Sequence, residues 1–217
     1  MLELGIKFLL SYFLGSIMGS LVVGRLRGGV DIRTMGSGNA GSTNALRTQG
    51  WVFALGVLVI DVGKGAAATG IVPELSIPFV QEDPNISRVW LALCCAGASV
   101  VGHVWPIGQK FRGGKGAATL IGTLTVLAPI LVVPLLLVWA WILTLFGYVG
   151  LATMAASVAA PAYLLLTVFP EDQSLIIYTA LMSAYMVFSH RSNVQRMRAG
   201  TEPRNTRLMV FRRSRSD

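Results

Sequence analysis

Residues 117–146 read AATLIGTLTVLAPILVVPLLLVWAWILTLF and contain no charged side chain. A helix needs about 20 residues to cross the hydrocarbon core of a bilayer, which is about 30 Å thick. The stretch is therefore too long for one crossing and short for two. We expect the break at Pro129, because proline opposes helix continuation and restricts the residue before it.

The rest of the chain has the same apolar character. Of its 217 residues, 53% are hydrophobic and only 13% are charged, which is too apolar for a soluble domain of this size. We predict an all-α, polytopic membrane helix bundle, with one transmembrane domain over 1–202 and a basic tail over 203–217. Seven transmembrane helices fit the pattern, with five as the alternative, at about 4–25, 50–72, 88–106, 116–128, 130–147, 150–168 and 174–190.

The distribution of charge predicts the topology. Arginine and lysine gather in 25–47, in 106–115 and after residue 190, and such segments are typical of the cytoplasmic side. Two other connections are acidic, one with Glu74, Glu82 and Asp83 and one with Glu171 and Asp172. We therefore expect the N-terminus outside and the C-terminus in the cytoplasm. This topology accounts for the net charge of +8 without nucleic acid.

The first cytoplasmic segment, Met35 to Arg47, reads MGSGNAGSTNALR. Its glycines let the backbone approach a ligand closely, its Ser, Thr and Asn side chains add neutral donors, and Arg47 adds a planar charged fork. That combination predicts a phosphate site, although an ordinary turn has a similar composition. The candidate residues for substrate are Ser37, Gly38, Asn39, Gly41, Thr43, Asn44 and Arg47.

The second segment runs from Gly102 to Thr119 and opens into an apolar helix. A helix N-terminus offers free N–H groups and a positive dipole end, so the cations and glycines before it predict a second phosphate-binding element. The alternative is that the cations only anchor the helix by the positive-inside rule. The spacing does not match a Walker A loop. Its candidate residues are Arg112, Gly113, Gly114, Lys115 and His103, which is alternatively a helix cap.

The third segment leaves the last apolar helix with His190, Asn193 and Arg196 at helical spacing, so one face could present polar groups. Beyond Pro203 we expect an unstructured arginine-rich tail attracted to anionic lipid. Inside the second span, Asp61 and Lys64 lie one turn apart. They are either a functional pair or a self-neutralising pair within the bundle.

The three segments together resemble the bacterial acyl-phosphate:glycerol-3-phosphate acyltransferase family (PlsY type). The resemblance rests on motifs in the same order from the first span to about Glu202. The motifs are Gly36-Ser-Gly-Asn-x-Gly-x-Thr-Asn-x-x-Arg47, Asp61-x-x-Lys-Gly65, Gly102-His-x-x-Pro106, Phe111-Arg-Gly-Gly-Lys-Gly-x-x-Thr119, His190-x-x-Asn-x-x-Arg196 and Gly200-Thr-Glu202. Ser42 stands where the family usually has alanine, and Arg112 where lysine is common, and neither removes a needed charge.

The resemblance implies transfer of a fatty acyl group from acyl phosphate to the 1-hydroxyl of sn-glycerol 3-phosphate, giving lysophosphatidate and phosphate as the first step of phospholipid synthesis. It implies a multi-pass enzyme of the bacterial cytoplasmic (inner) membrane with its active site facing the cytoplasm. No cofactor and no metal is expected, and membrane lipids are its surroundings. The resemblance points to Ser37, Lys115, His190 and Asn193 as catalytic residues, with Asn193 and Glu202 also joining the substrate-binding set.

An acyl phosphate is an activated mixed anhydride, so direct attack needs positioning and charge stabilisation more than a covalent intermediate. The departing phosphate or a histidine could accept the proton, and we favour the phosphate, with His190 orienting the hydroxyl or a phosphate oxygen. Two rival classes remain. A transporter for an organic phosphate would place its cations near the bilayer midplane. A CDP-alcohol phosphotransferase would need clustered aspartates for divalent cations.

Overall fold

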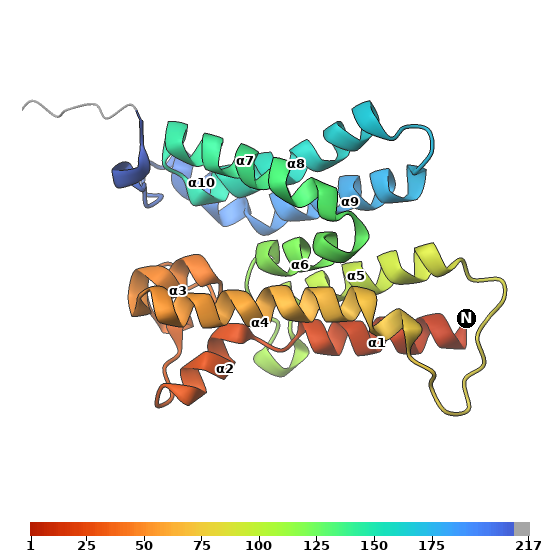
Figure 1. The fold of residues 1–217 in the computed structure, drawn as a ribbon. Coiled ribbons are helices and arrows are strands. Elements are labelled where there is room, and N and C mark those ends of the chain that lie inside the picture. The colour runs from red at the N-terminus through yellow and green to blue at the C-terminus, as the bar shows by residue number, and fades with distance from the viewer. Residues whose placement is uncertain (211–217) are drawn as a thin grey trace, which may run out of the picture. The chain divides into compact units, whose positions relative to one another are not determined.

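The computed structural model describes residues 1–210, and every regular element in that range is a helix (Figure 1). The chain divides into two compact units, Met1–Pro129 (unit 1) and Ile130–Asp217 (unit 2). The α-helices of unit 1 are α1 (Leu2–Gly15), α2 (Gly19–Leu26), α3 (Ser42–Gln49), α4 (Trp51–Gly70), α5 (Arg88–Val104) and α6 (Ala117–Leu127). Those that follow are α7 (Pro129–Phe146), α8 (Val149–Thr167), α9 (Gln173–Ser189) and α10 (Arg191–Arg198). Short 3₁₀ turns occur at η1 (Ile32–Thr34), η2 (Val72–Glu74), η3 (Ile107–Gln109) and η4 (Thr206–Leu208).

The all-α prediction is confirmed, and each predicted span coincides with a helix or a helix pair. Among the described residues, four helical stretches are long and apolar enough to cross a membrane, and the pair α1 and α2, bent by 44°, counts as a fifth only if it forms one span. The apolar helices α6 and α9 are shorter. Seven spans and the orientation of the termini therefore stay predictions.

The expected break in the longest apolar run is confirmed. Helix α6 ends at Leu127, and α7 begins at Pro129. Proline is well placed there because the first residue of a helix has no intrahelical use for its N–H group. The run 117–146 therefore folds as two helices that meet at the residue expected to separate them.

Helix α4 forms the centre of unit 1 and contacts α1, α2, α3, α5 and α6. Glycines let the backbones approach closely. A Cβ added at Gly122 of α6 would lie 2.0 Å from the carbonyl oxygen of Val62, and one at Gly65 of α4 would lie 2.3 Å from that of Thr119. Small residues at such crossings are a common way for membrane helices to gain van der Waals contact.

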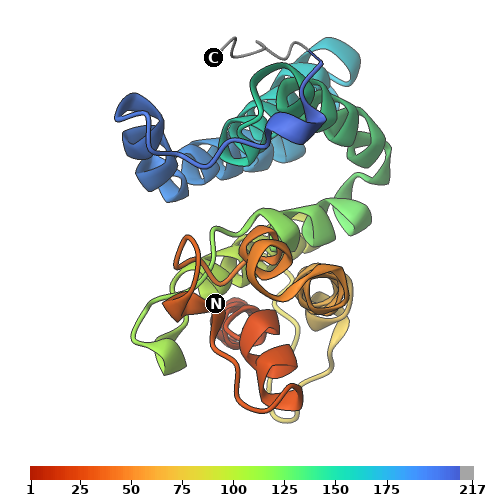
Figure 2. The same ribbon diagram turned by 90° about the vertical axis from the view of Figure 1, so that its left-hand side faces the viewer.

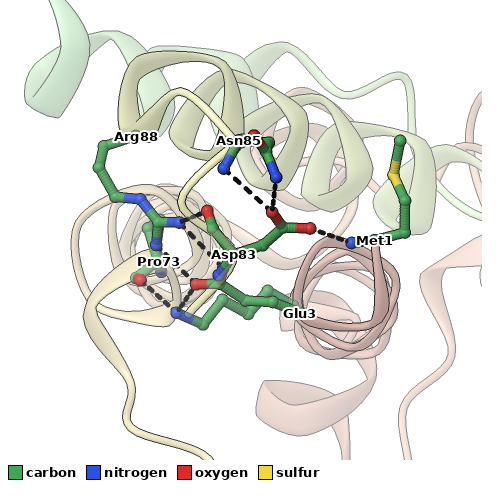
Figure 3. A network of polar contacts seen from close by, with 7 residues as sticks. Met1, Glu3, Pro73, Asp83, Asn85 and Arg88 are labelled. Atoms are coloured by element: carbon green, nitrogen blue, oxygen red, sulfur yellow. Dashed lines mark hydrogen bonds and ion pairs between the residues drawn. The ribbon is translucent and has the colours of Figure 1, made fainter. Parts of the chain in front are cut away.

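An ion-pair network joins the start of α1 to the start of α5 and the 71–87 connection (Figure 3). The Glu3 carboxylate accepts two bonds from Arg88, at 2.6 and 2.9 Å, and one from Lys7 at 2.9 Å. Lys7 also donates to the carbonyl oxygen of Pro73 at 2.6 Å, and the N-terminal amine pairs with Asp83. Glu3 and Lys7 are each only 2% exposed, so the charges that are buried are also paired.

Unit 2 is built on the packing of α8 against α9, with α10 against both. Its described C-terminal part is folded: the Asn205 amide donates to Gly147 O, the Val210 amide to Thr144 O and Arg204 Nε to Phe146 O. The expectation of an unstructured tail is thus wrong for residues 204–210, because their backbone finds acceptors at the end of α7. Residues 211–217 lie outside the described range.

Candidate functional site

The buried side chain of Asn44, in α3, organises the first polar segment. Its Nδ2 donates to the carbonyl oxygens of Ile32 at 2.9 Å, Met35 at 3.0 Å and Asn39 at 2.9 Å. Its Oδ1 accepts from the backbone N–H of Ser37 at 2.9 Å. Its observed partners are all backbone groups, so Asn44 shapes the loop. Its direct contact with substrate stays a prediction.

Two glycines allow the turn that Asn44 encloses. Gly36 and Gly38 have φ values of 57° and 71°, in the left-handed region. A Cβ at Gly36 would also lie 2.4 Å from Asn44 Oδ1. The glycine pattern read from the sequence therefore serves the backbone conformation of the loop.

The outward side of the same loop carries the predicted substrate-binding groups. Ser37, Gly38, Thr43 and Arg47 are exposed, while Asn39 and Gly41 are half-buried. Thr43 and Arg47 lie one helical turn apart on the exposed face of α3. The loop and α3 thus expose two hydroxyl groups and a guanidinium.

The second polar segment lies directly on the last turn of α5. The Gly113 amide donates to Val104 O at 3.2 Å, and the Gly114 amide to His103 O at 3.1 Å. A Cβ at Gly113 would lie 2.0 Å from His103 O, and one at Gly114 would lie 2.1 Å from His103 Nε2. Only glycine fits this close passage, so the two glycines support the loop rather than leave it flexible.

The turn before these glycines holds two non-glycine residues in the left-handed region. Lys110 and Phe111 have φ values of 53° and 58°, a conformation that costs about 1–3 kcal/mol per residue and is commonest at functional sites. Helix α6 then begins after Gly116. Arg112 is exposed and Lys115 is half-buried, so both cations stand just before a helix N-terminus, where the dipole favours anions.

Arg33 connects the first segment to the second. Its Nη1 donates to Gln109 Oε1 at 3.0 Å, and its Nη2 pairs with Asp31 Oδ2 at 2.7 Å. The hydrogen-bonded guanidinium lowers the pKa of the Asp31 carboxyl, and the carboxylate raises the pKa of Arg33. Sequence reasoning did not single out Arg33 or Gln109, because neither belongs to a glycine-rich motif.

Both segments lie in the half of unit 1 away from Met1. The turn η3 lies level with the break between α1 and α2, and α2 and α3 lie beyond it, while Met1 and the 71–87 connection lie at the other end (Figure 1). The view turned by 90° brings the α2 and α3 end to the front (Figure 2). A small cavity of about 170 Å³ at the break is lined by Met18, Arg25 and Gln109 among others. The structure thus brings the two predicted segments of unit 1 into one region.

The third predicted segment lies in unit 2, where Glu202 holds two side chains of α10. Its Oε1 accepts from Asn193 Nδ2 at 2.6 Å and its Oε2 from Arg196 Nε at 2.7 Å. Gly150 leaves room for Asn193, because a Cβ there would lie 2.8 Å from Asn193 Nδ2. Glu202 therefore positions Asn193 and Arg196. Its predicted contact with substrate is untested, and Gly150 had no signal in the sequence beyond being a glycine.

His190 sits between α9 and α10 and is 4% exposed. Its Nδ1 lies 2.8 Å from the carbonyl oxygen of Met186. A carbonyl only accepts hydrogen bonds, so Nδ1 carries a proton, and in the neutral ring Nε2 is the basic nitrogen. This geometry suits a histidine that orients a polar group through Nε2.

Asp61 and Lys64 have partners far along the chain. Lys64 Nζ lies 2.9 Å from Asp61 Oδ1, 2.5 Å from Ile17 O and 2.8 Å from His103 Nδ1. Asp61 Oδ1 accepts from the Gly19 amide at 3.2 Å. The pair therefore binds the backbone at the α1–α2 break as well as His103. The sequence predicted the pair but not these partners.

The donors of unit 1 suit a phosphate more than any other common ligand group. Arg47, Arg112 and Lys115 supply positive charge, and the amides before α3 and α6 supply neutral donors. Such a set holds an anion and stabilises charge that develops on oxygen.

Comparisons with known proteins agree with this chemistry. The sequence profile described as "Glycerol-3-phosphate acyltransferase" matches residues 5–200. A glycerol-3-phosphate acyltransferase of Salinibacter ruber is 38% identical, with 93% of this chain and 92% of that protein covered. One of Bacillus velezensis is 36% identical, covering 93% and 97%.

Solved structures show the same likeness. Two crystal structures of PlsY (YgiH), an integral membrane glycerol 3-phosphate acyltransferase, are 30% identical to this chain, with 93% of this chain and 94% of theirs covered. The glycerol 3-phosphate form superposes with a TM-score of 0.76 and the lysophosphatidic acid form with 0.75. The chain belongs to the glycerol-3-phosphate acyltransferase family of integral membrane proteins.

Proposed function

We propose that this protein transfers a fatty acyl group from acyl phosphate to the 1-hydroxyl of sn-glycerol 3-phosphate. The hydroxyl oxygen attacks the acyl carbonyl carbon, and the bond between that carbon and the bridging phosphate oxygen breaks. The products are lysophosphatidate and inorganic phosphate, which takes up the hydroxyl proton. No acyl-enzyme intermediate forms, because the mixed anhydride is already activated.

One observation carries this proposal. This chain belongs to the family, and its two glycine-rich, cation-bearing segments, 35–47 and 103–116, lie in one region of unit 1. Both proposed substrates carry a phosphate group. A site with Arg47, Arg112 and Lys115 beside backbone amides provides what two phosphates require. A solved relative was crystallised in a glycerol 3-phosphate form and a lysophosphatidic acid form, which are a substrate and the product of this reaction.

The residues divide the work by position. In unit 1, Ser37 and Arg47 bind substrate from the first loop, and Lys115 stabilises the negative charge that develops as phosphate departs. In unit 2, His190 orients the attacking hydroxyl or a phosphate oxygen through Nε2, and Asn193 donates a hydrogen bond to substrate. The enzyme is proposed to lie in the bacterial cytoplasmic membrane, with all three segments facing the cytoplasm. The basic loops support that orientation.

The test is an assay of the purified protein with glycerol 3-phosphate and, in parallel, acyl phosphate, acyl-CoA or acyl carrier protein as the acyl donor. We expect phosphate release and lysophosphatidate formation only when acyl phosphate and glycerol 3-phosphate are both present. EDTA should have no effect. Acyl transfer from acyl-CoA but not from acyl phosphate would contradict the proposal.

A second experiment addresses the segment in unit 2. Glu202→Gln keeps an acceptor for Asn193 but loses the charge that holds Arg196, and bonds to charged groups contribute about 1.5–3 kcal/mol. We expect kcat to fall in a protein that still folds. Thr201→Ala is the matched control, since Thr201 is exposed and its hydroxyl makes only a long bond of 3.4 Å. Equal kinetics for the two variants would remove Glu202 from the proposed site.

A further inference from the structure

The buried pair of Asp61 and Lys64 is more extensively bonded than a self-neutralising pair needs to be. Asp61 is 0% exposed and Lys64 is 5% exposed. An ammonium group has three N–H donors and no acceptor. Those of Lys64 meet three oxygen or nitrogen atoms, Asp61 Oδ1, Ile17 O and His103 Nδ1. Every donor of this lysine is therefore directed at a different structural element.

The pair binds the backbone at the break between α1 and α2 through one contact of Lys64 and one of Asp61. A broken helix inside a bilayer leaves backbone N–H and C=O groups that must be bound within the protein. Lys64 Nζ donates to Ile17 O at 2.5 Å, and Asp61 Oδ1 accepts from the Gly19 amide at 3.2 Å. If these were the pair's only contacts, its role would be purely structural.

The third contact continues to the second polar segment. His103 Nδ1 lies 2.8 Å from Lys64 Nζ and 3.4 Å from Asp61 Oδ1. A charged Lys64 can only donate, so this nearer contact assigns the acceptor role to Nδ1 and the ring proton to Nε2. The Nε2 edge faces Gly114, where an added Cβ would lie 2.1 Å from it. The Gly114 amide is in turn bonded to His103 O at 3.1 Å. The ring is thus bonded to Lys64 through Nδ1, and its Nε2 lies against Gly114, the residue before Lys115.

We propose that Asp61 and Lys64 are positioning residues for acyl transfer, which act by fixing the His103 ring on which the Gly113–Lys115 loop rests. The inference rests on the proposed function for its kinetic consequence, but not for its geometry. Asp61 and Lys64 lie inside the membrane-spanning α4 and need not touch substrate. Their effect on the reaction passes through the position of Lys115. Misplacing a catalytic group by about 1 Å can cost about a hundredfold in rate.

The chain offers a matched control at the other end of unit 1. Lys7 is 2% exposed, pairs with the carboxylate of Glu3 and donates to the carbonyl oxygen of Pro73 at 2.6 Å. In the described part of the chain its hydrogen-bond partners are Glu3 and Pro73, neither of which belongs to the two polar segments of unit 1. Lys7→Met and Lys64→Met therefore each delete a buried lysine that binds one carboxylate and one backbone carbonyl. Only Lys64→Met removes a bond to a histidine ring, and His103 Nδ1 then keeps Asp61 Oδ1 at 3.4 Å as its remaining neighbour in the pair.

Deleting Lys64 alone leaves Asp61 buried with too few partners, which is costly. The double variant Asp61→Leu with Lys64→Met removes that charge, since a buried ion pair can often be replaced by apolar residues without loss of stability. We expect the folded double variant to show kcat/KM lowered about tenfold to a hundredfold. The kcat/KM of Lys7→Met should stay within about twofold of the wild-type value, because Glu3 retains both bonds to Arg88.

A spectroscopic measurement separates this proposal from the proposed function. ¹⁵N NMR of histidine-labelled wild-type protein should show His103 with an unprotonated Nδ1 and a protonated Nε2. In the double variant that pattern should change. The proposal would be overturned if the folded double variant kept wild-type kinetics and an unchanged NMR pattern. A protonated Nδ1 of His103 in the wild type would also overturn it. So would a loss of kcat/KM in Lys7→Met equal to that in the double variant. A wild type without acyl transfer would defeat the proposed function, whereas the NMR pattern would still test the network.

Discussion

Replacing Asn44 tests whether one side chain holds the first polar segment in shape. Asn44→Ala removes the contacts of this side chain with Ile32 O, Met35 O, Asn39 O and the Ser37 amide. The two N–H groups of Nδ2 are shared among the three carbonyl oxygens. Each hydrogen bond contributes a net of about 0.5–1.5 kcal/mol, so two N–H donors and one accepted bond set an upper bound of about 4.5 kcal/mol. Met35 is exposed and Asn39 half-buried, so their carbonyl groups can turn to water, whereas Ile32 is 0% exposed. We therefore expect the free energy that holds the loop in its folded conformation to fall by about 2–4 kcal/mol.

The loss should be local, and the Gly38 amide reports it. That amide bonds to Met35 O at 3.0 Å and does not touch Asn44 itself. With about 1.4 kcal/mol for each factor of ten, its hydrogen exchange should become about thirtyfold to several hundredfold faster in Asn44→Ala. Under the proposed function, KM for glycerol 3-phosphate should rise in parallel, because the Ser37 and Arg47 region loses its shape.

Asn44→Asp makes the same experiment sharper. Aspartate keeps an acceptor for the Ser37 amide but faces three carbonyl oxygens with a carboxylate in place of an amide donor, so it should loosen the loop at least as much as alanine does. Thr43→Ala, on the exposed face of α3, should leave the exchange of the Gly38 amide unchanged. If Asn44→Asp preserved both that exchange rate and KM, the N–H donors of Asn44 would not be what holds the loop in shape.

Three further outcomes are expected. Gly122→Ala places a Cβ 2.0 Å from a carbonyl oxygen of α4, so the stability of the protein should fall by about 1–3 kcal/mol. Thermal inactivation in detergent measures this loss. The control Gly63→Ala should be neutral, because its Cβ meets nothing within 4 Å. His190→Gln should lower kcat without abolishing turnover, and complete loss in a folded, substrate-binding variant would identify an obligatory base. Arg33 lowers the pKa of Asp31 from 3.8. The pair therefore stabilises the fold above pH 3.8, and this stabilisation is lost as the pH falls through the lowered pKa of the folded state. An NMR titration of the Asp31 carboxyl tests the pair. Arg33→Met should raise the pKa of Asp31, and an unchanged pKa would contradict the pairing.

Apolar length and a single proline were enough to predict most helices. The predicted spans 116–128 and 130–147 correspond to α6 and α7, which meet at Pro129. The span predicted at 4–25 is instead broken between Gly15 and Gly19 and bent by 44°. No proline marks that break. Its backbone groups are bound by α4, which lies more than 40 residues along the chain, so hydropathy alone could not reveal it.

The candidate site divides in the same way between local and distant contacts. Asn44 binds carbonyl groups within 12 residues of itself, and Glu202 binds side chains within nine, so the motifs that contain them are legible as units. Their roles were nevertheless predicted too coarsely, because a motif shows which polar groups are close but not whether each faces the ligand or the backbone. The fold shows that Asn44 is buried and that Thr43, its neighbour on the same helix, is exposed, while the contact of either residue with substrate stays a prediction.

The buried lysine of α4 has more hydrogen-bond donors than one carboxylate oxygen can accept. A buried charge in a bilayer needs partners for every polar hydrogen, since water is absent. The spacing of Asp61 and Lys64 suggested that each is the other's partner, and they are, at 2.9 Å. One carboxylate oxygen uses only one of the three donors of an ammonium, so the remaining two required acceptors elsewhere. The sequence thus implied that further partners exist. Only the packing of α4 against α1 and α5 identifies them as Ile17 and His103.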